Sequence, residues 1–135
     1  MKQKRLDLDF DWRIWKSQSG DLKDLGSSRV SRMLFEIYLI NEFENAVLKL
    51  KNEDCVWGPV HSSVGQEAAA VASIAALQRK DKISGSHRAH HQFLAKALEY
   101  VFEDSWNPIA HSFPEKAQEV VNRTLAEIMG LASGY

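Results

Sequence analysis

Two turns that carry histidines hold the side chains best suited to chemistry in this sequence. The first turn covers residues 58–68 and the second covers residues 83–91, and each runs into a segment of helical character. Four of the five histidines lie in these turns, namely His61, His87, His90 and His91. The start of a helix presents unpaired backbone N–H groups and the positive end of the helix dipole, which together favour a bound anion. Arg88 in the second turn adds a fork of donors that matches a phosphate or a carboxylate.

The first turn contains the spacing of a helix-capping box. Ser63 and Gln66 stand three residues apart, so the serine side chain can accept from an N–H group of the first helical turn while the glutamine reaches back. We therefore expect the following helix, residues 66–78, to start just after His61. The same pair would also form in a purely structural helix, so the spacing alone does not separate a binding turn from a structural one.

The histidines of the second turn offer a different chemistry. His87 is separated from His90 and His91 by three and four residues, which places the three side chains on one helical face. Such a face could hold a transition metal. No nearby carboxylate or cysteine completes a ligand set, and Cys55 is the only thiol in the chain. We predict no metal ligands here and keep a histidine metal site as the lesser alternative.

Helical periodicity defines the elements that must position the two turns. Between residues 29 and 51 the apolar residues recur at three- and four-residue steps, which predicts one long helix with an apolar stripe. The stripe consists of Val30, Met33, Leu34, Ile37, Ile40, Phe43, Val47 and Leu50. The helix 66–78 is rich in alanine, which lets another backbone approach closely. Helical character resumes at residues 92–98, and Pro114 and Glu115 begin a last helix.

One short segment is predicted to be a strand. Residues 81–85 are too few for a helix, and they lead directly into the second turn. A parallel strand that feeds an anion-binding turn and a helix is how α/β folds place phosphates at the carboxyl end of a sheet.

The amino-terminal residues are predicted to form an extended arm. Apolar and charged side chains alternate strictly over residues 5–14, which puts every apolar side chain on one face of an extended segment. This arm would dock on another subunit or on further chain, or it would lie over its own domain. Residues 16–28 are rich in glycine, serine and charge and read as a linker. We therefore divide the chain into an arm and linker, residues 1–27, and a helical part, residues 28–135.

Composition and charge exclude several classes of function. The chain has 17 basic and 18 acidic residues, so no bulk field attracts nucleic acid or an anionic membrane. A hydrophobic fraction of 44% is ordinary for a globular chain. No apolar run approaches the length of a transmembrane helix. A single cysteine cannot form an internal disulfide and fits a reducing compartment, so we expect a cytoplasmic protein.

The first turn combines His61 with the run Gly65-Gln66-Glu67-Ala68. With these residues as the most specific part, the two turns resemble a known family, the α subunits of thiamine-diphosphate-dependent 2-oxo acid dehydrogenases. The other matching motifs are Gly58, Asp81-x-Ile83, Arg88-x-His90, Arg32-Met33, Phe43-Glu44 and Leu125-Ala126-Glu127-Ile128-Met129-Gly130. The resemblance covers most of residues 31–134, and its histidines favour the pyruvate or acetoin branch over the branched-chain branch.

The resemblance implies the amino-terminal portion of an α/β thiamine-diphosphate-binding fold, which in this piece is mostly α-helical. It implies oxidative decarboxylation of a small 2-oxo acid with transfer of the acyl group to a lipoyl arm. Arg88 would hold a diphosphate oxygen, and His87 would be a second donor. His61 and His90 would line the pocket near the reacting carbon as catalytic residues. The implied partners are a β subunit or β half and a lipoyl-bearing acyltransferase, in an oligomer.

The sequence departs from the family pattern at several places. His87 stands where a tyrosine is usual, His91 stands where a glycine is usual, and residues 99–122 look like an insertion. The motif that holds magnesium and diphosphate in the family is expected outside this chain, so we expect this fragment to be catalytically silent alone. A different reading is a non-catalytic helical interaction module, with the arm and the apolar stripe as its contact surfaces.

Overall fold

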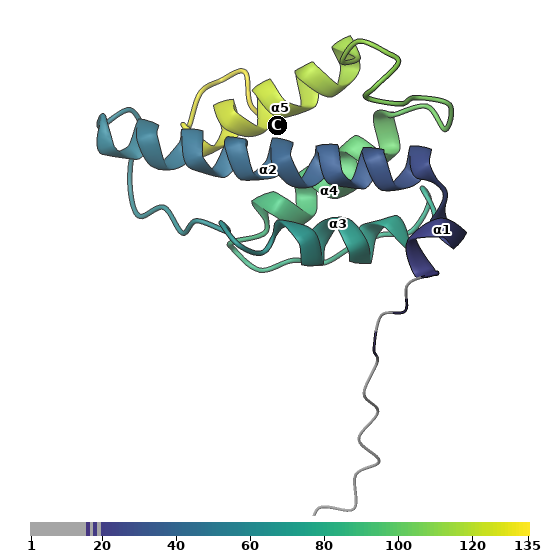
Figure 1. Cartoon of the computed structure of the whole chain (residues 1–135). Coiled ribbons are helices and arrows are strands. Elements are labelled where there is room, and N and C mark those ends of the chain that lie inside the picture. Colours follow the sequence, from purple (N-terminus) through teal and green to yellow (C-terminus); the bar gives the residue numbers. More distant parts are fainter. Residues whose placement is uncertain (1–15, 17, 19) are drawn as a thin grey trace, which may run out of the picture.

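Five helices make up the part of the chain that the computed structural model describes, which is residues 16, 18 and 20–135 (Figure 1). The helices are α1 (Asp21–Leu25), α2 (Ser27–Asn52), α3 (Glu67–Ala75), α4 (His90–Val101) and α5 (Glu115–Ile128). Helix α2 is by far the longest, and it spans the molecule from one end to the other. The extended arm predicted for residues 5–14 lies outside the described residues.

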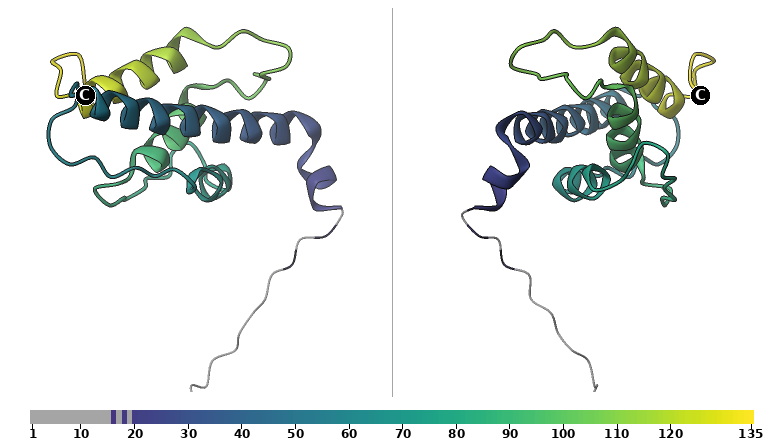
Figure 2. Two further views of the ribbon diagram at one scale, coloured as in Figure 1. Left: turned by 60° about the vertical axis from the view of Figure 1, so that its left-hand side comes forward. Right: turned by 90° about the vertical axis from the view of Figure 1, so that its right-hand side faces the viewer.

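Helices α2 and α4 lie between α3 and α5. Both α2 and α4 contact α3 on one side and α5 on the other, and they also contact each other. The two turned views show α4 running across the long α2 rather than along it (Figure 2). This crossing brings the start of α4, where the second turn ends, against the middle of α2.

The principal core lies where α2, α3 and α4 meet. Its buried members are Ile40, Phe43, Val47, Ala70, Val71, Ile74, Leu94 and Ala95. The centre of the predicted α2 stripe is therefore confirmed as buried, but Leu34 of the same stripe is 52% exposed. Periodicity defines a face of a helix without saying how much of that face a neighbour covers. Of the alanines of α3, only Ala70 is buried in this core, and Ala68, Ala69 and Ala72 are exposed.

A second core fixes the loop between α4 and α5. Phe102 and Trp106 stack face to face, with ring centroids 4.1 Å apart. Leu98 and Ala117 complete this cluster from the two flanking helices. The predicted start of the last helix is confirmed, since α5 follows Pro114, and α4 ends before this loop at Val101. The segment 99–122 thus contains the end of α4, a packed loop and the first half of α5.

Two predicted elements are corrected by the structure. The strand expected at residues 81–85 is absent, and the segment 81–86 is irregular. A strand needs a neighbouring extended segment to accept its backbone hydrogen bonds, and the described residues place none beside it. The α/β part of the predicted fold is therefore not visible in the described residues, which are helical with irregular loops.

The linker predicted for residues 16–28 is also wrong in part, because it contains α1 and the start of α2. The Asp21 carboxylate accepts from the backbone N–H of Gln18 at 2.8 Å and supports the short α1. Gly26 then takes a φ of 79°, a left-handed conformation that suits glycine, and the chain turns directly into α2. Among the described helices, none combines the length and the apolar character needed to cross a membrane.

Candidate functional site

Glycines in left-handed conformations shape the first turn. Gly58 has a φ of 76° and Gly65 has a φ of 91°, values at which a side chain would strain the backbone. Helix α3 begins at Glu67, whose carboxylate accepts from the backbone N–H of Gly65 at 2.9 Å. The turn therefore closes on a hydrogen bond from Gly65 to the first helical residue.

The predicted capping box does not form. Gln66 precedes α3 without any side-chain capping bond, and the helix starts later than expected. The Ser63 hydroxyl instead donates to the backbone carbonyl of Arg88 at 2.9 Å. The local rule failed because it does not take account of a tertiary acceptor from the second turn. The hydrogen bond from Ser63 to Arg88 therefore connects the first turn to the second.

The second turn packs tightly onto the start of α4. A side chain at Gly85 would meet the Cβ of Ala89 at 2.5 Å and the amide oxygen of Gln92 at 3.0 Å. The backbone N–H of Arg88 donates to the Ser86 hydroxyl at 3.3 Å. Helix α4 begins at His90 without a side-chain cap. A helix start without a side-chain cap leaves backbone N–H donors that could bind an anion.

The two turns meet through their histidines. The rings of His61 and His87 pack edge to face with centroids 5.2 Å apart. Arg88 is exposed beside them, and its guanidinium makes no hydrogen bond or ion pair to any described residue. The structure thus brings His61, His87 and Arg88 to one place. Their roles toward a cofactor stay predictions.

His90 faces a buried carboxylate on α2. Its Nδ1 lies 3.4 Å from Oε1 of Glu44, and neither atom has a hydrogen bond of good geometry to any other described group. The other oxygen of Glu44 accepts from the backbone N–H of Ser63 at 3.1 Å. Burial would raise the pKa of the Glu44 carboxyl, but His90, Ser63 and the charge of His91 hold that pKa below its ordinary value. Glu44 is therefore an anion at neutral pH.

A second buried carboxylate stands near the first. Glu67 accepts from the side-chain amide of Asn41 at 2.8 Å as well as from Gly65. Burial would raise the pKa of Glu67, but these donors and the nearby His91 hold the pKa below its ordinary value. Glu44 on α2 and Glu67 on α3 thus accept from two backbone N–H groups of the first turn that lie two residues apart, those of Ser63 and Gly65.

The sequence analysis missed the part that Glu44 and Asn41 play. The Phe43-Glu44 pair entered it only as a point of family resemblance. A signal was present, because Glu44 lies between Ile40 and Val47 on the apolar stripe of α2. A carboxylate on a buried face needs a partner, and this alone marks the position as unusual.

The three histidines of the metal alternative have different surroundings among the described residues. His87 contacts His61, His90 faces Glu44, and His91 is buried with its Nδ1 unpaired. Within the part of the chain that the structure describes, no three histidine, cysteine, aspartate or glutamate side chains are placed to hold a metal ion. The three histidines share a sequence spacing, but they diverge because only His90 and His91 belong to α4.

A hollow of about 320 Å³ opens beside the second turn. Its lining comes from the turn, from α4 and α5 and from the last residue of the chain. The residues are Ser86, His87, Ala89, His90, Phe93, Thr124, Glu127, Ile128 and Tyr135. His61 and Arg88 lie outside this lining. The hollow therefore adjoins His87 and His90, and it is not enclosed by both turns.

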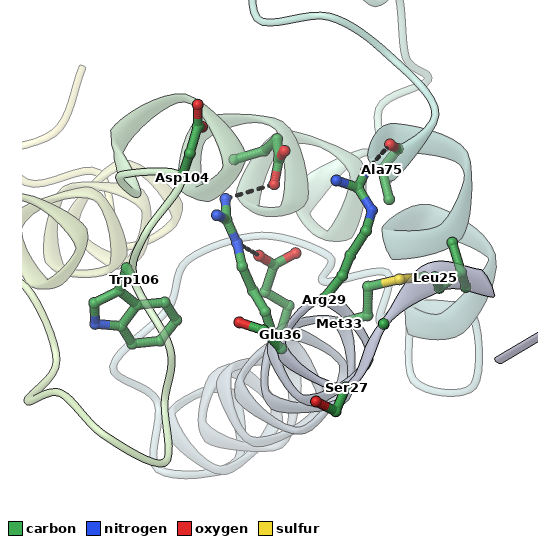
Figure 3. Close-up of a pocket in the computed structure, with 12 residues that line it drawn as sticks. Leu25, Ser27, Arg29, Met33, Glu36, Ala75, Asp104 and Trp106 are labelled. Carbon is green, nitrogen blue, oxygen red and sulfur yellow. Dashed lines mark hydrogen bonds and ion pairs between the residues drawn. The ribbon is translucent and has the colours of Figure 1, made fainter. Parts of the chain in front are cut away.

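A larger hollow, about 470 Å³, lies at the start of α2 (Figure 3). Arg32 there binds two carboxylates, Glu36 at 3.2 Å and Glu99 at 2.6 Å. Nearby, the Arg29 guanidinium donates to the carbonyl of Ala75 at the end of α3. None of the four turn histidines lines this hollow, so its size does not make it the candidate site.

Comparison with models of known protein families identifies a family for this chain. The family model described as "Dehydrogenase E1 component" matches residues 36–104, which is just over half of the chain. The matched range contains both turns, the carboxylates of Glu44 and Glu67, and all of α3 and α4. No curated protein and no solved structure matches the chain.

Proposed function

The chain belongs to the dehydrogenase E1 component family, and on that premise we propose that its two turns bind thiamine diphosphate for decarboxylation of a 2-oxo acid. This membership confirms the recognition of an α-subunit piece of a thiamine-diphosphate-dependent 2-oxo acid dehydrogenase. The observation that carries the proposal is the meeting of the turns. His61 packs on His87, and Ser63 binds the backbone of Arg88, so the residues that the resemblance assigns to the cofactor lie together.

The residues present fit a diphosphate group. The Arg88 guanidinium is exposed and unpaired among the described residues, and α4 starts beside it without a side-chain cap. Both features supply donors to an anion. His87 is a second donor at the same turn. We propose that the ligands of the accompanying magnesium lie outside this chain.

The remaining site residues act on the substrate in this proposal. Thiamine diphosphate supplies the nucleophilic carbon and the electron sink for decarboxylation. His61 and His90 stand near the reacting carbon, where an imidazole can donate to a developing oxyanion or to the substrate carboxylate. The substrate is a small 2-oxo acid of the pyruvate or acetoin type. A β subunit and a lipoyl-bearing acyltransferase complete the enzyme, in an oligomer.

Cofactor binding by the complete enzyme tests the proposal. Arg88→Ala should weaken the affinity for thiamine diphosphate with magnesium by roughly ten- to a hundredfold, since a hydrogen bond to a charged group contributes about 1.5–3 kcal/mol. Lys80→Ala is the matched control, because it removes one exposed positive charge that forms no ion pair or hydrogen bond with any described residue. Isothermal titration calorimetry measures both. Equal affinities for Arg88→Ala and wild type would reject the assignment.

A second candidate is a helical interaction module without chemistry. Leu34 and Tyr38 lie one turn apart on α2 and are both exposed, which suits a contact surface. Sedimentation of the purified chain tests this reading. A monodisperse monomer at all concentrations would argue against it.

A further inference from the structure

Glu44 is a charged side chain in an apolar place. It lies on the buried face of α2 between Ile40 and Val47, and none of its surface is exposed. An ionised carboxylate that loses its water costs several kcal/mol unless other groups replace the lost hydrogen bonds. The hydrogen-bond partners of the Glu44 carboxylate therefore indicate which parts of the structure it stabilises.

The carboxylate of Glu44 reaches both turns at once. Oε2 accepts from the backbone N–H of Ser63 in the first turn, and Oε1 faces Nδ1 of His90 at the end of the second. Ser63 is itself fully buried, and its hydroxyl donates to the carbonyl of Arg88. One carboxylate thus joins α2, the first turn and the start of α4.

The contact between Oε1 of Glu44 and Nδ1 of His90 determines which ring nitrogen of His90 carries the proton. An ionised carboxylate only accepts hydrogen bonds, so an Nδ1 without a proton would set two lone pairs against each other. No other described group bonds to Nδ1 of His90 or to Oε1 of Glu44. The favourable arrangement therefore has the proton on Nδ1, as in sites where a buried carboxylate orients a working imidazole.

We propose that Glu44 is the positioning residue of the cofactor site. It fixes the ring of His90, keeps the proton on Nδ1 and leaves Nε2 as the nitrogen that works on the substrate. His90 lines the hollow beside the second turn, so its ring has space to meet a ligand there. The inference rests on the proposed function for the role of His90. The pairing of Glu44 with His90 stands on the geometry alone.

Other titratable groups surround this pair. His91 comes from the same helix as His90, and Glu67 comes from the start of α3. The electrostatic interaction with His91 lowers the pKa of both carboxyl groups. A substitution must therefore keep the size of Glu44 and change only its hydrogen-bonding character.

Glu44→Gln meets that requirement. The glutamine carbonyl can still accept from Ser63, and the NH₂ group then points at Nδ1 of His90. A donor at that place forces Nδ1 to accept, so the proton should move to Nε2. The ¹⁵N chemical shifts of histidine distinguish the two tautomers. They are measured on the histidine-labelled complete enzyme without cofactor, and His90→Gln identifies the resonance. Glu42→Gln, on the exposed side of α2, is the matched control.

We expect the Nδ1–H form in the wild type and in Glu42→Gln, and the Nε2–H form in Glu44→Gln. An Nε2–H form in the wild type overturns the proposal without any variant of Glu44 having to fold. The same tautomer in wild type and Glu44→Gln also overturns it.

Measurements of kcat/KM and of thiamine diphosphate affinity distinguish failure of this proposal from failure of the proposed function. Loss of a group that orients a working histidine typically lowers activity by roughly ten- to a hundredfold. We expect that loss in kcat/KM for Glu44→Gln, with thiamine diphosphate affinity unchanged because Arg88 still holds the diphosphate. An unchanged kcat/KM overturns the proposal. If the wild type fails to bind thiamine diphosphate, the proposed function is wrong, and the tautomers still decide the pairing.

Discussion

The most quantitative prediction concerns Glu36 and the pH dependence of stability. Glu36 lies on α2 near the larger hollow, with its side chain only 5% exposed. Burial raises its pKa from 4.5 to about 7, although Arg32 binds it and opposes the rise. Glu99 shares Arg32 and adds a repulsive charge. The folded protein therefore keeps a proton that the unfolded chain releases.

The difference between the pKa of Glu36 in the folded and in the unfolded chain determines how stability changes with pH. Between about pH 4.5 and pH 7, unfolding releases the proton of Glu36, so a rising pH favours the unfolded state. Stability should fall through this window and level off above it. At about 1.4 kcal/mol per pKa unit, the loss due to Glu36 is roughly 3 kcal/mol.

Glu36→Gln removes the titration and keeps the size of the side chain. Urea denaturation from pH 4 to pH 8 should show the variant gaining about 3 kcal/mol relative to the wild type across the window. Glu42→Gln reports the effect of removing a carboxylate from the exposed side of the same helix. If the curves of wild type and Glu36→Gln run parallel with pH, the reasoning about Glu36 is refuted.

Two further predictions test the loop core and the first turn by denaturation. Phe102→Ala should destabilise by about 3–5 kcal/mol, because the buried ring loses its stack on Trp106. Tyr100→Ala, at a ring 65% exposed, should cost much less, and equal losses would contradict the packing account. Gly65→Ala should cost about 1–2 kcal/mol, since a left-handed φ of 91° is strained with any Cβ although nothing crowds it. Gly20→Ala has open space and an ordinary φ, and a similar loss there would remove the conformational explanation.

The elements were largely predictable from the sequence because their signals are local. The apolar stripe placed α2, and the glycines marked a turn that does need left-handed residues at 58 and 65. Pro114 marked the start of α5. The family recognition rested on motifs in the same turns and is confirmed by the match to residues 36–104.

The failed predictions depend on distant parts of the chain. Ser63 leaves the capping box for a carbonyl 25 residues away, which no local rule detects. The free-energy cost of burying the Glu44 carboxylate is offset by Ser63 and His90. These two residues reach Glu44 only in the folded protein, where α4 crosses α2. Residues 81–85 were predicted to be a strand from their short length and their place before the second turn, but a strand depends on a neighbour that the described residues lack.

A structure of the complete enzyme with thiamine diphosphate and magnesium tests the central claim most directly. The account predicts a diphosphate oxygen within about 3 Å of the Arg88 guanidinium and the reacting ring facing His61 and His90. A diphosphate bound away from Arg88, with His61 and His90 facing no part of the cofactor, would contradict it.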